Sequence, residues 1–445
     1  SFHTGLTRSL DWRREQLRRL QDLLDENQPD IAEALKADLG KSPIEAFMTD
    51  VSIVKPEIDL ALASLSRWTR PRKVRTPLVQ QPASASLVPE PLGVVLIIAP
   101  WNYPVNLLLL PLVAALAAGN CVVLKPSEVS AHTAALMARL LPRYLDAAAI
   151  AVYEGGVAET TALLRERFDH ILYTGGGAIG QVILEAAAKH LTPVTLELGG
   201  KSPVIVDRDV DLAVAARRIV WGKYLNAGQT CIAPDYVLVH ESREAELLEA
   251  MKQTLREFYG EDPKASVDFS RIINERHLRR LVGLLQRSGG QVVVGGQHDE
   301  AQRYLAPTIV RGVRPDAPLM GEEIFGPILP VLTIKSTEEA IRFINERPKP
   351  LALYLFTNDE RLTEEVQSRT SSGALGVNNT IWHVINPHLP FGGVGPSGMG
   401  AYHGEAGFTL FSHRKPVVKR PTRVDPNVLY PPLVPWKQAI IKRLL

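Results

Sequence analysis

The chain has 445 residues, of which 45% are hydrophobic and 22% are charged, and its formal net charge is +2. A chain of this length exceeds a single hydrophobic core, so two or three domains are expected. The small net charge, with no long basic run, argues against a nucleic-acid partner. The cysteines Cys121 and Cys231 lie far apart without a Cys/His cluster, which argues against disulfides and a metal site and favours the reducing cytoplasm.

The first part of the chain carries two amphipathic helical patterns, over residues 8–38 and 43–69. Prolines then interrupt alternating apolar residues over 72–90, which predicts a hairpin that projects from the body. Residues 408–420, near the other end of the chain, have the pattern of a returning strand. We expect this strand and the hairpin to form a small third unit.

Short apolar strands and helical segments alternate from Gly93 onward. The expected strands cover residues 93–99, 121–124, 149–153, 169–174 and 193–198, and the expected helices cover 105–118, 130–141, 158–166 and 178–189. This alternation predicts a parallel sheet with helices on both faces, as in dinucleotide-binding domains. A second α/β set follows Lys201. The fold class is therefore α/β, with a doubly wound parallel-sheet cofactor domain, a second α/β domain and a small β unit.

Residues 91–124 contain no acid, base or histidine, and hydropathy alone would make them a membrane span. Pro100, Pro104 and Pro111 divide this stretch into a strand, a turn, a helix and a second strand, because proline interrupts helical hydrogen bonding. Strands of parallel sheets are buried on both faces and are apolar throughout. We therefore expect the stretch to be buried core.

Two reactive side chains stand out beside apolar segments. Cys231 lies in the polar sequence NAGQTCIAPD and is either a nucleophilic thiol or a small buried side chain. Glu197 ends an expected strand in TLELGGKSP, where ligands of open α/β sheets bind. A lone carboxyl among apolar residues should have a raised pKa, which suits a general base, and a capping or salt-bridged acid is the alternative. Cys121 lies inside a strand pattern and is expected to be buried core.

Glycines and charged residues follow two other expected strands. Gly175, Gly177 and Gly180 form a GxGxxG pattern before a helix, where backbone can approach a phosphate. This pattern would make Glu197 a ribose-binding acid, but it follows the fourth strand of the unit rather than the first. Lys125 and Glu128, in VVLKPSE, are candidates to hydrogen-bond an adenosine ribose, with surface charges at a helix start as the alternative.

Seven motifs occur together in one order along the chain: PWNYP, LKPSE, YTGGGAIG, LELGGKSP, GQTCIAPDY, EEIFGPILP and PFGGVGPSG. In these motifs, their order and their approximate spacing, the chain resembles the aldehyde dehydrogenase superfamily over nearly its whole length. GVNNTIWH, GPSGMGAYHGEAGFTLFSHRKPV and the tail sequence LYPPL are similar to the class 3 branch, which includes fatty and aromatic aldehyde dehydrogenases.

The resemblance implies an oxidation of aldehydes to carboxylic acids with NAD(P)+. In this family Cys231 would be the nucleophile that forms a thiohemiacetal and then a thioester. The side-chain amide of Asn102 would stabilise the oxyanion together with the Cys231 backbone N–H. Glu197 would activate the water that hydrolyses the thioester.

The resemblance also implies a set of cofactor-binding residues. These are Lys125 and Glu128 at the adenosine ribose, Thr174 and Gly175 near the pyrophosphate or nicotinamide, Gly180 at the start of the helix beyond, Glu323 at the nicotinamide ribose, and Phe391 near the nicotinamide ring. A carboxylate at Glu128 repels a 2′-phosphate, so NAD is the first choice and NADP the alternative.

Class 3 positions suggest that Tyr103, Trp221, Ile381 and Trp382 line the substrate pocket, with core packing as the alternative for Trp221. An apolar, aromatic pocket favours a medium- or long-chain aliphatic or an aromatic aldehyde. Two other functions remain open from the sequence. One is a thiol-dependent esterase without redox chemistry, and the other is a non-catalytic structural or membrane-scaffold protein.

The expected organisation follows from these assignments. Residues 1–71 and 92–198 form the NAD-binding domain, 199–398 the catalytic domain, 72–91 and 399–425 the oligomerisation strands, and 426–445 a tail. The family resemblance matches these strands to an oligomerisation unit, and the class 3 likeness implies a homodimer. The tail sequence VPWKQAIIKRLL predicts an amphipathic helix, placed over the substrate mouth, on a membrane surface, or against the body or a partner subunit.

Overall fold

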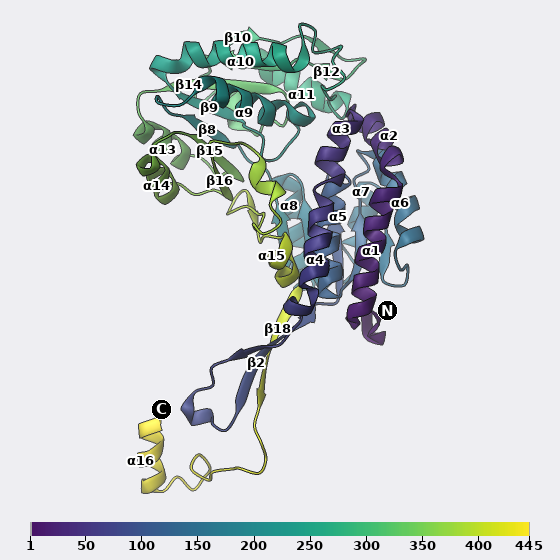
Figure 1. Cartoon of the computed structure of the whole chain (residues 1–445), viewed down its shortest axis with the longest axis vertical. Helices are drawn as coiled ribbons and strands as arrows, with labels where there is room; N and C mark the ends of the chain where they lie inside the picture. The colour runs from purple at the N-terminus through teal and green to yellow at the C-terminus, as the bar shows by residue number, and fades with distance from the viewer. Residues whose placement is uncertain (1, 445) are drawn as a thin grey trace.

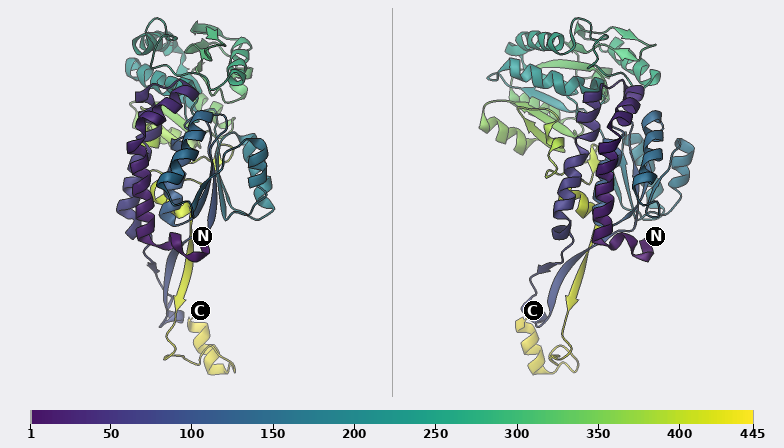
Figure 2. Two further views of the ribbon diagram at one scale, coloured as in Figure 1. Left: turned by 90° about the vertical axis from the view of Figure 1, so that its right-hand side faces the viewer. Right: turned by 45° about the vertical axis from the view of Figure 1, so that its right-hand side comes forward.

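The computed structural model describes residues 2–444. Two α/β bodies lie side by side, and a long arm projects from the lower end of the body that contains the N-terminus (Figure 1). The same arm extends away from both bodies when the molecule is turned (Figure 2). Each body therefore has its own sheet, and the arm is the third part of the molecule.

The N-terminal helical region differs from the expected single helix over 8–38. It forms α1 (Leu10–Glu26) and α2 (Gln28–Leu39), preceded by the 3-10 turns η1 (Phe2–Thr4) and η2 (Leu6–Arg8). Asn27 separates the helices, and its side chain donates to the Leu23 carbonyl at 2.9 Å. Pro29 lies in the first turn of α2, where the missing N–H costs no helical hydrogen bond.

The second expected helix, over 43–69, is also divided. It consists of α3 (Pro43–Ala46), a π-helical turn η3 (Phe47–Val51) and α4 (Val54–Trp68). The π turn buries Thr49 and Asp50, two polar side chains that a regular amphipathic helix would expose. Such turns often occur at functional sites, and this one lies under the active-site region described below.

The first body has a six-stranded sheet with the order β17-β7-β6-β3-β4-β5. The strands are β3 (Val94–Ile98), β4 (Cys121–Lys125), β5 (Ile150–Val152), β6 (His170–Thr174), β7 (Val194–Glu197) and β17 (Gly398–Met399), and the helices are α5 (Asn106–Ala118), α6 (Ala131–Tyr144), α7 (Val157–Leu163) and α8 (Gly177–Ala188). Strands β3 to β7 pair in parallel, which confirms the doubly wound prediction. β17 pairs antiparallel with β7, so residue 398, which was assigned to the catalytic domain, belongs to this sheet.

The apolar stretch 91–124 lies in this body. It forms β3, the Pro100–Pro104 turn, α5 and the start of β4, and every residue of α5 is buried. Among the described residues, no helix is long and apolar enough to cross a membrane. The hydrophobicity of the stretch is therefore explained by burial in the protein core.

The second body has a seven-stranded sheet with the order β10-β13-β14-β9-β8-β15-β16. Its strands are β8 (Pro203–Val206), β9 (Tyr236–His240), β10 (Gln291–Val294), β13 (Thr308–Arg311), β14 (Ile328–Ile334), β15 (Ala352–Phe356) and β16 (Ala374–Val377). Its helices are α9 (Leu212–Tyr224), α10 (Glu244–Tyr259), α11 (Glu275–Gln286), α12 (Pro318–Gly321), α13 (Thr337–Asn345) and α14 (Glu360–Arg369). All neighbours pair in parallel except β10 with β13, and β11 (His298–Asp299) with β12 (Tyr304–Leu305) forms a separate short hairpin.

The arm is a three-stranded antiparallel sheet of β1 (Arg72–Val74), β2 (Ser84–Pro91) and β18 (Ser412–Lys419). β18 pairs with β2 from Ser412 opposite Pro91 to Lys419 opposite Ser84. The returning strand is shorter than expected, because residues 408–410 belong to α15 (Gly404–Leu410), which packs against α4 and α5. Part of the range assigned to the oligomerisation strands is thus packed on the first body.

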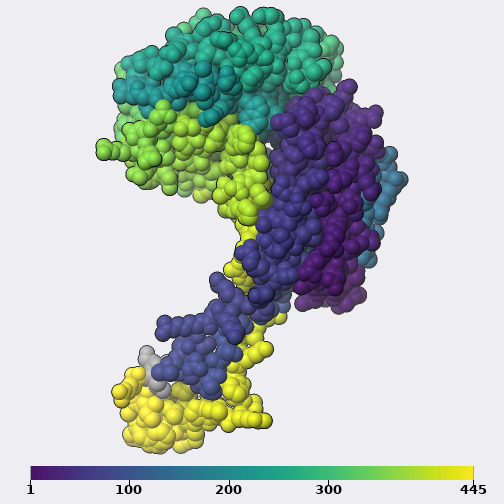
Figure 3. Space-filling model, viewed as in Figure 1, coloured from purple at the N-terminus to yellow at the C-terminus, as the bar shows by residue number. Residues whose placement is uncertain are grey.

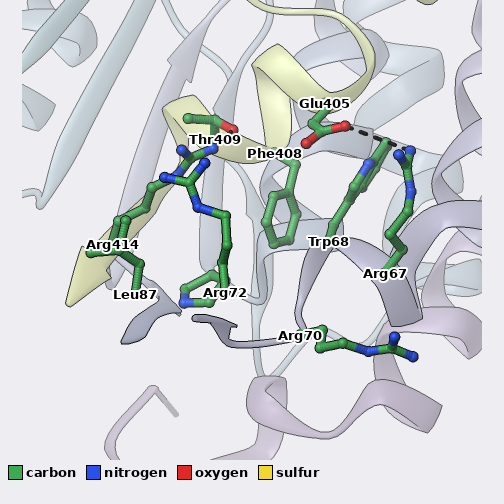
Figure 4. Close-up of a pocket in the computed structure, with 10 residues that line it drawn as sticks. Arg67, Trp68, Arg70, Arg72, Leu87, Glu405, Phe408, Thr409 and Arg414 are labelled. Atoms are coloured by element: carbon green, nitrogen blue, oxygen red, sulfur yellow. Dashed lines mark hydrogen bonds and ion pairs between the residues drawn. The ribbon is translucent and has the colours of Figure 1, made fainter. Parts of the chain in front are cut away.

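The base of the arm is held by aromatic packing. The rings of Trp68 and Phe408 lie 5.4 Å apart between centroids, in a cavity of about 130 Å³ (Figure 4). Four arginines surround these rings: Arg67, Arg70, Arg72 and Arg414. Arg67 pairs with Glu405 at 3.5 Å, but both side chains are exposed, so the packed rings contribute more to holding the arm than this ion pair.

The tail ends in α16 (Pro435–Leu444), which lies beside the tip of the arm and away from both bodies (Figure 1, Figure 3). Lys437 is buried, and its ammonium donates to Asn427 Oδ1 at 3.2 Å and to the Tyr430 carbonyl at 2.9 Å. Trp436 and Ile440 are exposed. Lys437 was expected on the exposed polar face of the helix, and this expectation is wrong because the side chain is buried. The helix also does not cover the substrate cavity of its own chain (Figure 1).

Candidate active site

Two cavities meet at Cys231, between the carboxyl ends of the first sheet and the second body. The polar cavity, of about 320 Å³, is lined by Trp101, Asn102, Thr174, Gly175, Glu197, Gly199, Cys231, His277, Arg280, Glu323 and Phe325, among others. The apolar cavity, of about 60 Å³, is lined by Thr49, Tyr103, Leu110, Cys231, Ile232, Ile381, Val384, Phe391, Tyr402 and His403, among others. The thiol therefore lies where the small apolar cavity meets a larger cavity that carries the polar groups of Asn102, Glu197 and Glu323.

A strained loop brings Cys231 to this position. After α9, the turn η5 (Leu225–Gly228) places Asn226 and Ala227 in the left-handed region, with φ of 53° and 51°. Gly228 also has a positive φ of 76°, and a Cβ there would lie 2.3 Å from the Gly326 carbonyl oxygen. The loop thus needs glycine at this point, and its strain is of the kind found at functional sites.

Gln229 holds the loop from inside. Its side-chain amide donates to the carbonyls of Asn226 at 3.0 Å and Arg271 at 2.9 Å, and its Oε1 accepts from the Ile273 N–H at 2.9 Å. These bonds explain why a polar residue next to the cysteine is buried. They tie the cysteine loop to the segment before α11.

Asn102 meets the cysteine loop from the first body. It is buried in the turn after β3, and its Nδ2 donates to the Gln229 carbonyl at 3.0 Å. Its own carbonyl accepts from Asn226 Nδ2 at 2.8 Å. A primary amide has two N–H donors, so the bond to Gln229 fixes the plane of the amide and leaves a donor for the polar cavity.

Glu197, at the end of β7, lines the polar cavity and is only 1% exposed. Neither carboxyl oxygen has a hydrogen-bond partner within residues 2–444, so the capping or salt-bridged alternative is wrong for this side chain. Burial raises the pKa of Glu197 well above its usual value. A raised pKa makes the ionised carboxylate a stronger proton acceptor, which suits a general base in this cavity.

The two cysteines have different surroundings. Cys121 lies buried in β4, as predicted, whereas Cys231 lines both cavities. Burial, with smaller contributions from the nearby carboxylates Glu323 and Glu197, raises the pKa of Cys231. The thiol is therefore protonated at neutral pH in this structure and must lose its proton before it can attack a carbonyl.

The polar cavity has the groups that the nicotinamide half of NAD(P) requires. Thr174 Oγ1 and Glu323 Oε1 are buried with no hydrogen-bond partner in the described chain, and each is available for a ribose hydroxyl or an amide. Burial, followed by the charge of Asp235, raises the pKa of Glu323 to about 8. A Cβ on Gly199 would lie 2.0 Å from Glu323 Oε2, so glycine leaves room for this carboxyl in its observed position. These residues fit the cofactor.

Four of the expected cofactor residues lie outside the lining of this cavity, and their roles stay predictions: Lys125, Glu128, Gly180 and Phe391. The Lys125 ammonium, at the end of β4, is 3.3 Å from Glu128 Oε2 and 2.7 Å from the Pro126 carbonyl, outside the lining of the polar cavity. Gly180 does not open a helix, because α8 begins at Gly177, and it packs inside the first turn near Leu198. Phe391 lines the apolar cavity instead of the polar one.

The predicted substrate residues divide into two pairs. Tyr103 and Ile381 line the apolar cavity, and the Tyr103 hydroxyl is 2.5 Å from Thr230 Oγ1. Trp221 and Trp382 pack against each other at 6.2 Å, but neither lines this cavity, and Trp382 is 59% exposed. For this pair a role in the substrate pocket stays a prediction.

Sequence reasoning missed several residues of both cavities. Tyr402 and His403 close the apolar cavity, with their rings 4.7 Å apart and Phe391 beside them. His277 enters the polar cavity from α11, 5.1 Å from the ring of Trp101. Trp101 and Phe325 lie inside recognised motifs, whereas His277 belongs to an amphipathic helix with no local signal.

Comparisons with known proteins agree with this arrangement. The model of the aldehyde dehydrogenase family matches residues 6–417. Among the similar relatives, the "Aldehyde dehydrogenase, dimeric NADP-preferring" of Rattus norvegicus is 52% identical over 93% of this chain and 91% of its own. "Aldehyde dehydrogenase family 3 member A2" of the same organism is 51% identical over 97% of this chain and 89% of its own.

A solved structure described as the substrate-bound state of Staphylococcus aureus AldH superposes with a TM-score of 0.97. It is 46% identical and covers 99% of this chain and 96% of its own. A structure of an NAD-dependent aldehyde dehydrogenase from Sinorhizobium meliloti, 29% identical, has a TM-score of 0.87 over 95% of this chain and 85% of its own. By sequence, fold and cavity chemistry, the chain belongs to the aldehyde dehydrogenase family and is an NAD(P)-dependent enzyme.

Proposed function

We propose that Cys231, Glu197 and Asn102 perform the aldehyde oxidation of this family, and that the substrates are medium- or long-chain aliphatic or aromatic aldehydes. The observation that carries this proposal is the position of Cys231. It lies at the boundary of the apolar cavity, with the Glu197 carboxyl and the Asn102 amide on the polar side. Membership of an enzyme family disfavours the scaffold alternative.

The first half of the reaction forms a covalent bond to Cys231. The thiol gives its proton to solvent water, and the thiolate attacks the aldehyde carbon to give a thiohemiacetal oxyanion. The Asn102 amide, fixed by Gln229, donates to this oxygen together with a backbone N–H. Bound NAD(P)+ supplies the acceptor for the hydride, and the oxidised carbon remains on Cys231 as a thioester.

The second half releases the acid. Glu197 accepts a proton from a water molecule, and the hydroxide attacks the thioester carbon. The carbon–sulfur bond breaks, and the proton on Glu197 is available for the leaving thiolate. A raised pKa suits this task, because the carboxyl must both take up and give back a proton near neutral pH.

The cavity lining supports the proposed substrate class. Leu110, Ile232, Ile381 and Val384 supply apolar surface, and Tyr103 and Phe391 supply aromatic surface. An aldehyde with a long alkyl chain or a ring buries more apolar area here than a small polar one, and each buried methylene adds about 0.8 kcal/mol of binding free energy.

The chain is also proposed to form a homodimer through the arm. The relative named as dimeric is one support, and the long exposed β18 edge is the other. Light scattering on the purified protein should give twice the monomer mass, and a monomer mass would contradict the proposal.

Contact of the exposed Trp436 and Ile440 with a membrane surface stays a prediction, which sedimentation with anionic vesicles checks.

The role of Glu197 predicts a specific kinetic defect. In Glu197→Gln, the first turnover should still release NADH, whereas steady-state turnover should fall at least about 100-fold, because only the hydrolytic step needs the base. Stopped-flow absorbance at the NADH band separates the two phases. In the native enzyme, turnover should rise with pH as Glu197 loses its proton. A Glu197→Gln variant with normal turnover would remove Glu197 from the mechanism.

The apolar cavity predicts selectivity by chain length. Val384→Phe should narrow the cavity and raise KM for decanal and benzaldehyde about tenfold, with less than about a twofold change for acetaldehyde. The neighbouring Ile385 is exposed and does not line the cavity, so Ile385→Phe is the matched control. Equal effects of Val384→Phe on all three aldehydes would show that this cavity does not hold the substrate.

A further inference from the structure

A buried ion pair lies directly beneath the Asn102 turn. Lys41 and Asp50 are both 0% exposed, and the ammonium of Lys41 is 2.7 Å from Asp50 Oδ2. Lys41 follows α2, and Asp50 lies in the π turn η3. Neither residue touches the polar cavity, so neither takes part in the chemistry described above.

The positive member of the pair contacts the active-site turn. Lys41 Nζ lies 3.3 Å from the Asn102 carbonyl oxygen and 4.1 Å from the centre of the Tyr103 ring. It also donates to Thr49 Oγ1 at 3.3 Å. One cation thus contacts the backbone of the proposed oxyanion donor and the face of a ring that lines the aldehyde cavity.

The negative member holds the other end of the same turn. Asp50 Oδ1 accepts from the backbone N–H groups of Val105 and Asn106, at 3.2 and 3.3 Å. These N–H groups lie at the start of α5, where a carboxylate is favoured by the helix dipole. The ion pair therefore forms hydrogen bonds with the turn at Asn102 and again at the beginning of α5.

A second contact fixes Asn102 from the opposite body. Asn226 donates to the same Asn102 carbonyl at 2.8 Å, and the Asn226 N–H donates to Glu45 Oε1 at 2.7 Å. Glu45 Oε2 in turn accepts from Ser270 Oγ at 2.7 Å. The carbonyl of Asn102 is thus held from both sides, while its side-chain amide is held by Gln229.

We propose that Lys41 and Asp50 are positioning residues that set the orientation of the Asn102 amide toward the substrate carbonyl. This inference rests on the proposed role of Asn102. Burying two charges is costly, and apolar residues of similar size often give equal or greater stability. The pair is therefore better explained by the turn that it orients than by stability alone.

The test is a double-mutant cycle on the rate of the NADH burst. Asn102→Ala should slow the burst about 100-fold, as expected for loss of an oxyanion donor. Lys41→Met should slow it about tenfold in the native background but less than about twofold in the Asn102→Ala background, because its effect passes through Asn102. KM for NAD(P)+ should not change.

Arg13→Met is the matched control. Arg13, on α1, is also a buried cation, but it donates to the Ala117 carbonyl at the far end of α5, at 3.0 Å. This variant should lower the melting temperature without changing the burst rate. If Lys41→Met does not fold, Asp50→Asn replaces it, since the amide oxygen can still accept from α5 while the charge is lost.

The outcomes separate the two claims. If Asn102→Ala leaves the burst unchanged, the proposed role of Asn102 fails, and the positioning role fails with it. If Asn102→Ala is slow but the effects of Lys41→Met and Asn102→Ala multiply, only the positioning role is overturned. A burst in Lys41→Met equal to that of the native enzyme would overturn it as well.

Discussion

The hydrogen bond from the Asn102 amide to the Gln229 carbonyl joins the two α/β bodies at the reacting sulfur. Asn102 comes from the turn after the first strand of the cofactor sheet, and Gln229 comes from the left-handed loop of the second body. The Cys231 thiol, the proposed oxyanion donor Asn102 and the proposed base Glu197 are brought together only while these two segments keep their relative position. The buried loop glycine, the side chain of Gln229 and the contacts on the Asn102 carbonyl all support this one junction.

The electrostatics of the site follow from the same closeness. Cys231, Glu197 and Glu323 share one cavity, and burial raises the pKa of all three groups. Ionising one of them makes it harder to ionise the others, because like charges repel strongly in a medium of low polarity. The site is thus suited to passing a single proton between a thiol, a water molecule and a carboxyl. Apolar surroundings on the aldehyde side strengthen each of these interactions.

The sequence was informative wherever a local pattern had a single structural solution. The alternation of apolar runs and helices predicted the parallel order of β3 to β7, and the motifs identified Cys231, Glu197 and Asn102, which the structure brings to one cavity. Local pattern failed where tertiary contacts decide. Asn27 breaks an amphipathic helix that hydropathy would continue, and Phe391 lines the apolar cavity together with Tyr402 and His403, which no local pattern indicated. Lys41 and Asp50 have the pattern of solvated helix charges, and only the fold of the π turn against α5 buries them together.

The central claim is that the oxidised substrate passes through a covalent bond to Cys231, and mass spectrometry tests it most directly. Glu197→Gln is mixed with decanal and NAD+, quenched in acid within the first turnover and digested. The account predicts that the peptide containing Cys231 gains one decanoyl group in place of a hydrogen, while the peptide containing Cys121 is unchanged. NADH release with no acyl group on Cys231, or an acyl group on Cys121 instead, would contradict it.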